Sequence, residues 1–317
     1  MVDILVLDGA MHGMPIRECA DRLREELPDR TVAVGSTPAE HRELIADAEV
    51  VVGEQLDPAL LESANNLRLF ACSWAGVGHV DLDAIEAHDV AVTNATGVHG
   101  PNVAEHVLGW FLMVTRRLDE GIRRQDRHEW RHFQSIGELA GSRVSIVGLG
   151  AIGETIVERL QGFDVHSVGV RYTPEKGGPT DEVYGFDQIT EAVVDADYVA
   201  LACPLTETTR GLIARDELAA MSADVVIANV ARGPVVHTDD LLWALNEGRI
   251  GSACLDVTDP EPLPPDHPLW NFGNVHITPH TAGHTPFYWR RVADILIENL
   301  DRVSDSGEWT GLRNQVI

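Results

Sequence analysis

Lysine is almost absent from this sequence, in which 23 of the 24 basic residues are arginine and the single lysine is Lys176. Fifty acidic residues outnumber these bases and give a formal net charge of −26. The acids are dispersed along the chain, and the apolar content of 44% is too high for a disordered acidic protein. A field of this sign repels phosphate backbones and anionic lipids, which argues against nucleic acid and membrane surfaces as partners.

Cysteines and long apolar runs are also scarce. The four cysteines are scattered without a Cys-x-x-Cys pair, a pattern typical of reduced, buried thiols in a cytoplasmic protein. The N-terminus leads directly into the short run Ile4–Leu7 and lacks a signal peptide, and no run approaches the roughly 18 residues of a membrane span. His276 and His280 are four residues apart, but no carboxylate pattern completes a zinc site, so no metal is expected.

One stretch has the order strand, glycine turn, helix, strand. The apolar run Val144–Val147 is followed by Gly148, Gly150 and Gly153 in a Gly-x-Gly-x-x-Gly turn, and a helical segment and a second apolar run come next. In such a unit the glycines allow a tight turn, a close approach of pyrophosphate and close packing of the helix. The helix start then offers free N–H groups to the phosphates. The stretch therefore predicts a dinucleotide site.

The end of the second strand of this unit bears on the choice of cofactor. An acidic residue there binds the ribose 2′-hydroxyl of NAD, whereas an arginine accommodates the 2′-phosphate of NADP. Arg171 stands at this position and is followed by Tyr172, Thr173 and Lys176. NADP is therefore the first expectation and NAD the second.

Short apolar runs alternate with helical segments over most of the remaining chain. This alternation predicts an α/β fold in which parallel sheets carry helices on both faces, and 317 residues suffice for two such doubly wound domains with a cleft between them. The final helix, from Pro286 to about Val303, is expected to complete the first domain. The predicted strands outside the glycine unit are Asp3–Leu7, Thr31–Val34, Val50–Val52, Leu67–Ala71, Val90–Val92, Tyr198–Ala202, Val225–Ala228, Ser252–Leu255 and Val275–Ile277.

After the predicted strands of the first domain, the chain contains a long helical stretch, from Val103 to about Arg124. Pro101 opens it, and its centre is apolar on all sides, which is typical of a helix buried between domains or in a subunit contact. The segment Arg123–Phe133 is rich in charges and aromatics and is expected to form a projecting arm.

Three polar residues follow predicted strands of the glycine-turn domain. Arg232, Glu261 and His280 would all face the edge of the sheet at which the cofactor lies. An arginine holds a carboxylate through two parallel hydrogen bonds, and an imidazole titrates near neutral pH and can supply a proton. A carboxylate beside the imidazole stabilises its protonated form. Taken singly, each residue is better explained as an ordinary surface or capping residue.

Several motifs together resemble the D-isomer-specific 2-hydroxyacid dehydrogenases. The glycine turn, the segment Ala231–Val236, the segment Leu255–Pro264 and the segment Asn274–Gly283 occur in the family's order, and the resemblance extends over nearly the whole chain. It implies that Arg232, Glu261 and His280 are catalytic. It also implies a flavodoxin-like substrate domain, residues 1–100 plus 285–317, and a Rossmann coenzyme domain, residues 101–284, whose residues 101–135 form a homodimer contact.

The resemblance also implies binding residues. Asp256 is expected to bind the nicotinamide amide, and Cys203, Pro204 and Val230 to line the nicotinamide ribose. For the substrate, Trp74, Ala75, Gly76 and Val77 join Arg232 and His280. The full expected cofactor set is Gly148, Leu149, Gly150, Ala151, Ile152, Gly153, Arg171, Tyr172, Thr173, Lys176, Cys203, Pro204, Thr209, Val230, Ala231, Asp256 and Gly283.

Three positions depart from the family pattern. His237 replaces a usual acid, Thr258 replaces a common phenylalanine, and Arg171 replaces the acid that selects NAD. We expect no regulatory domain after Val303, and this expectation argues against the larger phosphoglycerate dehydrogenases. The expected activity is NADP(H)-dependent hydride transfer between the nicotinamide and C2 of a 2-keto acid or D-2-hydroxy acid. The alternatives are an NAD-preferring glyoxylate/hydroxypyruvate reductase and, from another class, a nucleotide-sensing protein similar to corepressors.

The dispersed acidic charge predicts a protein adapted to high salt, because screening over a few ångströms suppresses self-repulsion there. We expect dialysis from molar salt into low-salt buffer to remove structure and activity together. Circular dichroism measures the loss of structure, and turnover measures the loss of activity. Full retention of both at low salt would contradict this prediction.

Overall fold

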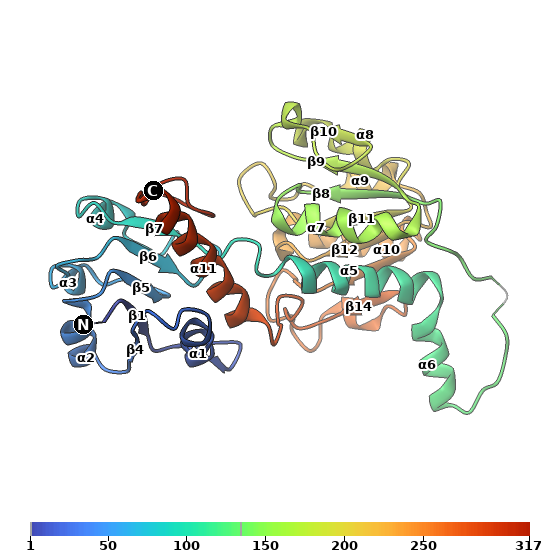
Figure 1. Cartoon of the computed structure of the whole chain (residues 1–317). Coiled ribbons are helices and arrows are strands. Elements are labelled where there is room, and N and C mark those ends of the chain that lie inside the picture. The colour runs from blue at the N-terminus through green and yellow to red at the C-terminus, as the bar shows by residue number, and fades with distance from the viewer. Residues whose placement is uncertain (1, 134) are drawn as a thin grey trace. The chain divides into compact units, whose positions relative to one another are not determined.

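The computed structural model describes residues 2–133 and 135–317. The chain divides into two compact units, Met1–His99 with His284–Ile317 (unit 1) and Gly100–Gly283 (unit 2). Each unit is built on one parallel sheet with helices on both faces (Figure 1), so the predicted α/β fold is confirmed. Met1, in the predicted substrate domain, and Gln134, in the predicted dimer contact, lie outside the described residues. The cleft between the domains stays a prediction.

The sheet of unit 1 has five parallel strands in the order β4-β1-β5-β6-β7. In chain order this is 2-1-3-4-5, which is the flavodoxin-like arrangement. The strands are short and almost entirely buried, as expected of a parallel sheet covered on both sides. Their bounds are β1 Ile4–Leu7, β4 Val32–Gly35, β5 Val50–Gly53, β6 Leu69–Cys72 and β7 Ala91–Thr93.

Alternate residues of the strands of unit 1 enter two separate cores. Ile4 and Val6 of β1 pack with helices α1, Arg17–Glu26, and α11, Tyr288–Ser306. Leu5 of the same strand enters the other core. The helices of that second face are α2 Pro38–Ile45, α3 Pro58–Leu61 and α4 Leu82–Glu86.

Two short features of unit 1 were not predicted from the sequence. The antiparallel hairpin of β2, Ala10–Met11, and β3, Met14–Pro15, turns at His12 and Gly13, which both have positive φ. Strands of two residues are too short for a recognisable alternation. The second feature is the C-terminal segment, which pairs with the edge strand β7 through hydrogen bonds between the backbones of Val92 and Val316 (2.7 Å) and of Ile317 and Val92 (3.2 Å).

The sheet of unit 2 has seven parallel strands in the order β10-β9-β8-β11-β12-β13-β14. Numbered within the unit, its first six strands follow the Rossmann order 3-2-1-4-5-6, and one more strand extends the edge. Their bounds are β8 Arg143–Val147, β9 His166–Val170, β10 Glu182–Tyr184, β11 Tyr198–Leu201, β12 Val226–Asn229, β13 Ser252–Leu255 and β14 Val275–Ile277.

Helices cover both faces of this second sheet. On one face lie α5, Gly100–Thr115, and α7, Ala151–Leu160. On the other lie α8 Ile189–Val193, α9 Arg215–Ala220 and α10 Thr238–Asn246. Short 3-10 turns are η1 Gln161–Phe163, η2 Pro174–Lys176, η3 Phe186–Gln188, η4 Gly233–Val235 and η5 Pro268–Asn271.

The long helix predicted from Val103 to about Arg124 is two helices, and the single-helix prediction is wrong. Helix α5 ends at Thr115, Arg117 adopts a left-handed backbone with φ of 52°, and α6 begins at Leu118 and runs to Asp126. The acidic residues Asp119 and Glu120 occupy the first turn of α6, where the positive end of the helix dipole favours negative charge. The apolar pattern continues across the break, so periodicity alone did not reveal it.

Strand β10 and helix α8 were also missed. Every residue of β10 is only half-buried, and the strand includes Glu182, so it lacks an apolar run. Glu182 accepts hydrogen bonds from Arg143 (2.8 and 3.0 Å), from His166 (2.7 Å) and from Tyr184 (2.7 Å). Foremost among these, the Arg143 guanidinium holds the pKa of the Glu182 carboxyl well below its usual range. Polar pairing of Glu182 thus adds to the partial packing of Val183 and Tyr184 in holding this edge strand.

The four cysteines are free and buried. Burial raises the pKa of Cys19 to about 12 and that of Cys203 to about 11, so neither thiol ionises near neutral pH. Cys72 and Cys254 shift in the same direction for the same reason. The thiols therefore behave as small core residues rather than as nucleophiles.

Candidate active site

The predicted cofactor and catalytic residues of unit 2 follow the carboxyl ends of its strands. The glycine turn follows β8, Cys203 follows β11, Arg232 follows β12, Asp256 follows β13 and His280 follows β14. Because all these strands are parallel, their carboxyl ends share one edge of the sheet. Ligands of open α/β sheets bind outside this edge.

Two glycines of the turn are required by the packing of the protein itself. Gly148 has a φ of 106°, and a Cβ there would lie 2.6 Å from the backbone nitrogen of Cys203. A Cβ on Gly153 would lie 2.0 Å from the carbonyl oxygen of Gly148. These positions let helix α7 and the loop after β11 close tightly around the turn.

Gly150 is different, because the protein gives no internal reason for it. Its φ of −109° is open to any residue, and a Cβ built on it would meet nothing within 4 Å. It is the N-cap residue of α7, a ten-residue helix. A bare backbone beside free helical N–H groups fits a pyrophosphate that approaches from outside. The turn therefore fits the dinucleotide that the sequence predicts.

A pocket of about 650 Å³ lies beside this turn. Nine predicted cofactor residues line it: Gly148, Leu149, Gly150, Arg171, Tyr172, Thr173, Lys176, Pro204 and Thr209. Five lining residues were not predicted: Phe186, Ala202, Thr206, Glu207 and Thr208. The predicted residues outside its lining are Ala151, Ile152, Gly153, Cys203, Val230, Ala231, Asp256 and Gly283.

Arg171 is held at the pocket by a neighbour on each side. Its Nη1 donates to the carbonyl oxygen of Gly177 (2.6 Å) and lies 3.8 Å from the carboxylate of Glu154 in the first turn of α7. Tyr172 beside it is 82% exposed, so its ring is free to cover a ligand. On the other wall the Thr209 hydroxyl, itself buried, donates to the carbonyl oxygen of Pro204 (2.6 Å) and fixes that loop.

The loop after β12 presents Arg232 to solvent from a fixed backbone. Asn229 closes the loop on itself, because its side-chain amide donates to the carbonyl oxygen of Arg232 (3.1 Å) and its side-chain oxygen accepts from the Ala231 amide (3.0 Å). A Cβ on Gly233 would lie 2.0 Å from the carbonyl oxygen of Thr258. The Arg232 loop is thus packed directly against the segment that leads to Glu261.

His280 and Glu261 form a hydrogen-bonded pair at this edge. The Nδ1 of His280 lies 2.5 Å from Oε1 of Glu261, and the two side chains are 48% and 39% exposed. His280 has a φ of 54°, a left-handed conformation that is uncommon outside glycine. The contact with Glu261 at Nδ1 leaves Nε2 as the ring nitrogen that faces away from the carboxylate.

Asp256 has a structural task that the sequence did not predict. Its buried carboxylate accepts from the Thr278 hydroxyl (2.6 Å) and from the amides of Thr281 (2.9 Å) and Ala282 (2.9 Å). Its carbonyl oxygen accepts from the amide of His280 (2.9 Å). Asp256 therefore anchors the turn that carries His280, a role separate from its predicted contact with the nicotinamide amide.

The predicted substrate loop lies in unit 1, directly after β6. Trp74 is 39% exposed, Ala75 and Gly76 are exposed, and Val77 is half-buried. The carbonyl oxygen of Trp74 accepts from the amide of Ala95 (3.0 Å). A Cβ on Gly76 would meet nothing within 4 Å, so the backbone of the loop is open to a small ligand.

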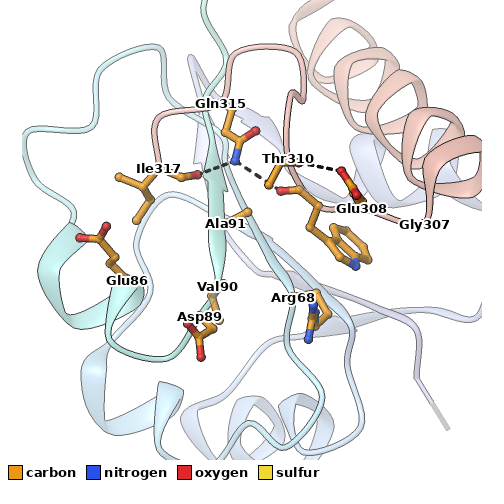
Figure 2. A pocket seen from close by; sticks show the side chains of 11 residues that line it. Arg68, Glu86, Asp89, Val90, Ala91, Gly307, Glu308, Thr310, Gln315 and Ile317 are labelled. Carbon is orange, nitrogen blue, oxygen red and sulfur yellow. Dashed lines mark hydrogen bonds between the residues drawn. The ribbon is translucent and has the colours of Figure 1, made fainter.

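Another cavity, about 590 Å³ in volume, belongs to unit 1 and lies between the C-terminal segment and β7 (Figure 2). Its polar groups pair with one another, since the side-chain amide of Gln315 donates to the carbonyl oxygens of Trp309 (3.3 Å) and Ile317 (2.9 Å). None of the predicted site residues lines it, so it is not the candidate site.

Within residues 2–133 and 135–317, no group of three or more His, Cys, Asp or Glu side chains could hold a metal ion. In the same residues, no helix is long and apolar enough to cross a membrane.

Comparison with known families identifies the chain. The family model described as D-isomer specific 2-hydroxyacid dehydrogenase, NAD binding domain, matches residues 108–282, more than half of the sequence. The chain belongs to the D-isomer-specific 2-hydroxyacid dehydrogenase family. The members of this family are NAD(P)-dependent oxidoreductases.

Individual relatives agree with this assignment. A D-3-phosphoglycerate dehydrogenase from Methanocaldococcus jannaschii is 34% identical over 309 residues, which cover 96% of this chain but only 57% of that protein. A glyoxylate reductase from Thermofilum pendens is 33% identical over 300 residues, which cover 90% of this chain and 86% of that protein. The crystal structure of a D-isomer specific 2-hydroxyacid dehydrogenase from Xanthobacter autotrophicus Py2, in complex with NADPH and MES, has a TM-score of 0.76 and 27% identity and covers 100% of this chain and 98% of that chain.

In this family member, sequence reasoning missed the residues that support the site. Asn229 stands at a strand end beside Arg232, and that position was the available signal. His106 of helix α5 contacts Thr278 in the turn before His280 (3.1 Å), across 172 positions of sequence. No local pattern connects two such residues.

Replacing Gly150 with alanine should weaken dinucleotide binding by about tenfold or more while the melting temperature stays unchanged, because the new methyl group meets only the ligand. Gly162→Ala is a matched control, since a Cβ there also meets nothing within 4 Å. Isothermal titration with NADPH and NADH measures the effect. Unaltered affinity in Gly150→Ala would remove the pyrophosphate from this turn.

Proposed function

We propose that the chain is an NADP(H)-dependent D-2-hydroxyacid dehydrogenase that interconverts a 2-keto acid and a D-2-hydroxy acid. The observation that carries this proposal is the 2.5 Å contact between His280 and Glu261 at the strand edge beside the glycine turn. A histidine oriented by a carboxylate is a proton donor and acceptor suited to a carbonyl oxygen. The catalytic set we assign is Arg232, Glu261 and His280.

Each of the three residues has a separate task in this proposal. Arg232, exposed on its clamped loop, binds the substrate carboxylate and stabilises charge that develops on the carbonyl oxygen. The Nε2 of His280 gives its proton to that oxygen during reduction and takes it back during oxidation. Glu261 holds the ring at Nδ1 and fixes its orientation. When bound, the nicotinamide dinucleotide supplies or accepts the hydride at C2 of the substrate.

NADP(H) is the cofactor that we favour. Arg171 and Lys176 are two cations that line the pocket, and Thr173 lies between them in the sequence. Together they suit a 2′-phosphate. Glu154, 3.8 Å from Arg171, favours NAD(H) instead, because its charge opposes a phosphate at that place. An NAD-preferring glyoxylate or hydroxypyruvate reductase is therefore the second candidate, and the name of the Thermofilum relative fits its substrate class.

We assign the substrate domain to unit 1 and the coenzyme domain to unit 2, with the open loop Trp74–Val77 as the site of the substrate carboxylate. We further propose a homodimer formed through α5, α6 and the arm after it. Apolar side chains stand exposed there, with Trp130 at 97%, Ile122 at 60% and Leu118 at 53%. Surfaces of this kind mark interaction sites. The free thiols agree with a cytoplasmic location.

A scan of 2-keto acids with NADPH and NADH tests the activity directly. The loss of nicotinamide absorbance measures the turnover of each acid. His280→Ala should then lower kcat by about 100-fold or more, because the proton donor is lost, while cofactor affinity stays the same. His166→Ala is the matched control, since His166 is also half exposed and also pairs with a glutamate, at the opposite end of the strands. Near-normal turnover in His280→Ala would show that another group supplies the proton.

Arg171→Ala should weaken NADPH binding by roughly tenfold more than NADH binding, because a charged hydrogen-bond donor to the 2′-phosphate is lost. Arg159→Ala, on the last turn of α7, serves as the control. Dissociation constants for both cofactors measure the ratio. Equal losses for the two cofactors would favour the NAD-preferring alternative.

A further inference from the structure

One face of helix α5 holds both ends of the turn that carries His280. Asn102 donates from its side-chain amide to the carbonyl oxygen of Ala282 (2.6 Å). His106, one helical turn later, contacts the Thr278 hydroxyl through Nε2 (3.1 Å). The two contacts lie on either side of His280 in the sequence, so α5 braces the turn from both directions.

The hydrogen-bond inventory fixes the direction of the His106 contact. The Thr278 hydroxyl has one hydrogen, which it donates to the Asp256 carboxylate 2.6 Å away. The Thr278 oxygen is therefore an acceptor toward His106, and Nε2 of His106 must carry a hydrogen. Burial lowers the pKa of His106, and Asp256 acts in the opposite direction. The lowered pKa favours the neutral ring, and the contact with Thr278 places the hydrogen of that ring on Nε2.

The turn needs such support because its backbone is unfavourable. His280 adopts a φ of 54°, and a non-glycine residue in this region persists only where its surroundings impose the conformation. Asp256, directly after β13, imposes this conformation through three hydrogen bonds to its carboxylate. The Thr278 hydroxyl joins that carboxylate to helix α5, so the chain His106–Thr278–Asp256 links a helix to two strand ends.

We propose that His106 is a positioning residue for His280, acting through Thr278 and Asp256. Its Nε2–H orients the Thr278 hydroxyl toward Asp256, and this fixes the turn so that the His280 ring stays against Glu261. A small displacement of a catalytic group costs turnover much more than it costs substrate affinity. The effect on turnover rests on the proposed function, whereas the effect on the turn itself does not.

A merely structural role for His106 is the competing explanation, since its ring also packs edge-on against Trp110 (4.3 Å between centroids). Two substitutions separate the roles. His106→Leu fills similar space without a donor, whereas His106→Gln restores an N–H close to the position of Nε2. His276 is a matched control, because burial lowers its pKa too, but its Nε2 faces Asp119 (3.8 Å) rather than the turn.

The experiment measures kcat and KM for the best 2-keto acid of the scan. We expect kcat to fall by about tenfold in His106→Leu with KM within about twofold, and to return to within about threefold of wild type in His106→Gln. His276→Leu should leave kcat within about twofold of wild type after correction for folded fraction. Equal kcat in the two His106 variants, or a loss in His276→Leu as large as in His106→Leu, would overturn the proposal.

Amide hydrogen exchange of the full chain supplies a readout that needs no substrate. We expect the amides of Thr281 and Ala282, which donate to Asp256, to lose protection in His106→Leu and to keep it in His106→Gln. If the wild-type protein reduces no 2-keto acid, the proposed function fails and the exchange measurement alone decides the positioning role. Full protection of both amides in His106→Leu would refute that role regardless of activity.

Discussion

The buried carboxylate of Asp256 is the interaction on which the candidate site depends. A carboxylate removed from water is costly unless donors surround it, and here three donors come from the single turn after β14. The same three hydrogen bonds hold the turn of residues 278–282 against the end of β13. His280 is thereby positioned by the hydrogen-bonding needs of a neighbouring buried acid.

Close backbone contacts extend this rigidity to the rest of the edge. Gly153 lies against Gly148, Gly148 against the loop of Cys203, and Gly233 against Thr258. The last two pairs join the ends of different strands, so displacing one of these loops requires its neighbour to move as well. The glycines of a dinucleotide fold are often discussed for the ligand, but in this chain only Gly150 lacks an internal partner among them.

Much of this arrangement could be predicted from the sequence. Apolar runs of four or five residues located the buried strands, and the parallel order then placed Arg232, Asp256 and His280 on one edge. Two features that the sequence did not predict have no periodic signature of their own. Apolar residues recur at helical spacing on both sides of the break at Arg117, and strand β10 is stabilised by polar pairs of Glu182. The role of His106 also escaped notice, because its partner lies 172 residues away and only the packed fold brings the two together.

The split of unit 1 into two segments of sequence has a consequence for biosynthesis. Helix α11 supplies one wall of the core around β1, yet 184 residues of unit 2, numbers 100–283, separate it from the first 99. A ribosome therefore releases all of unit 2 before the face of the first sheet that α1 and α11 cover has received α11. The nascent chain is exposed to aggregation through that interval, and chaperone protection of residues 1–99 is the requirement that this topology imposes.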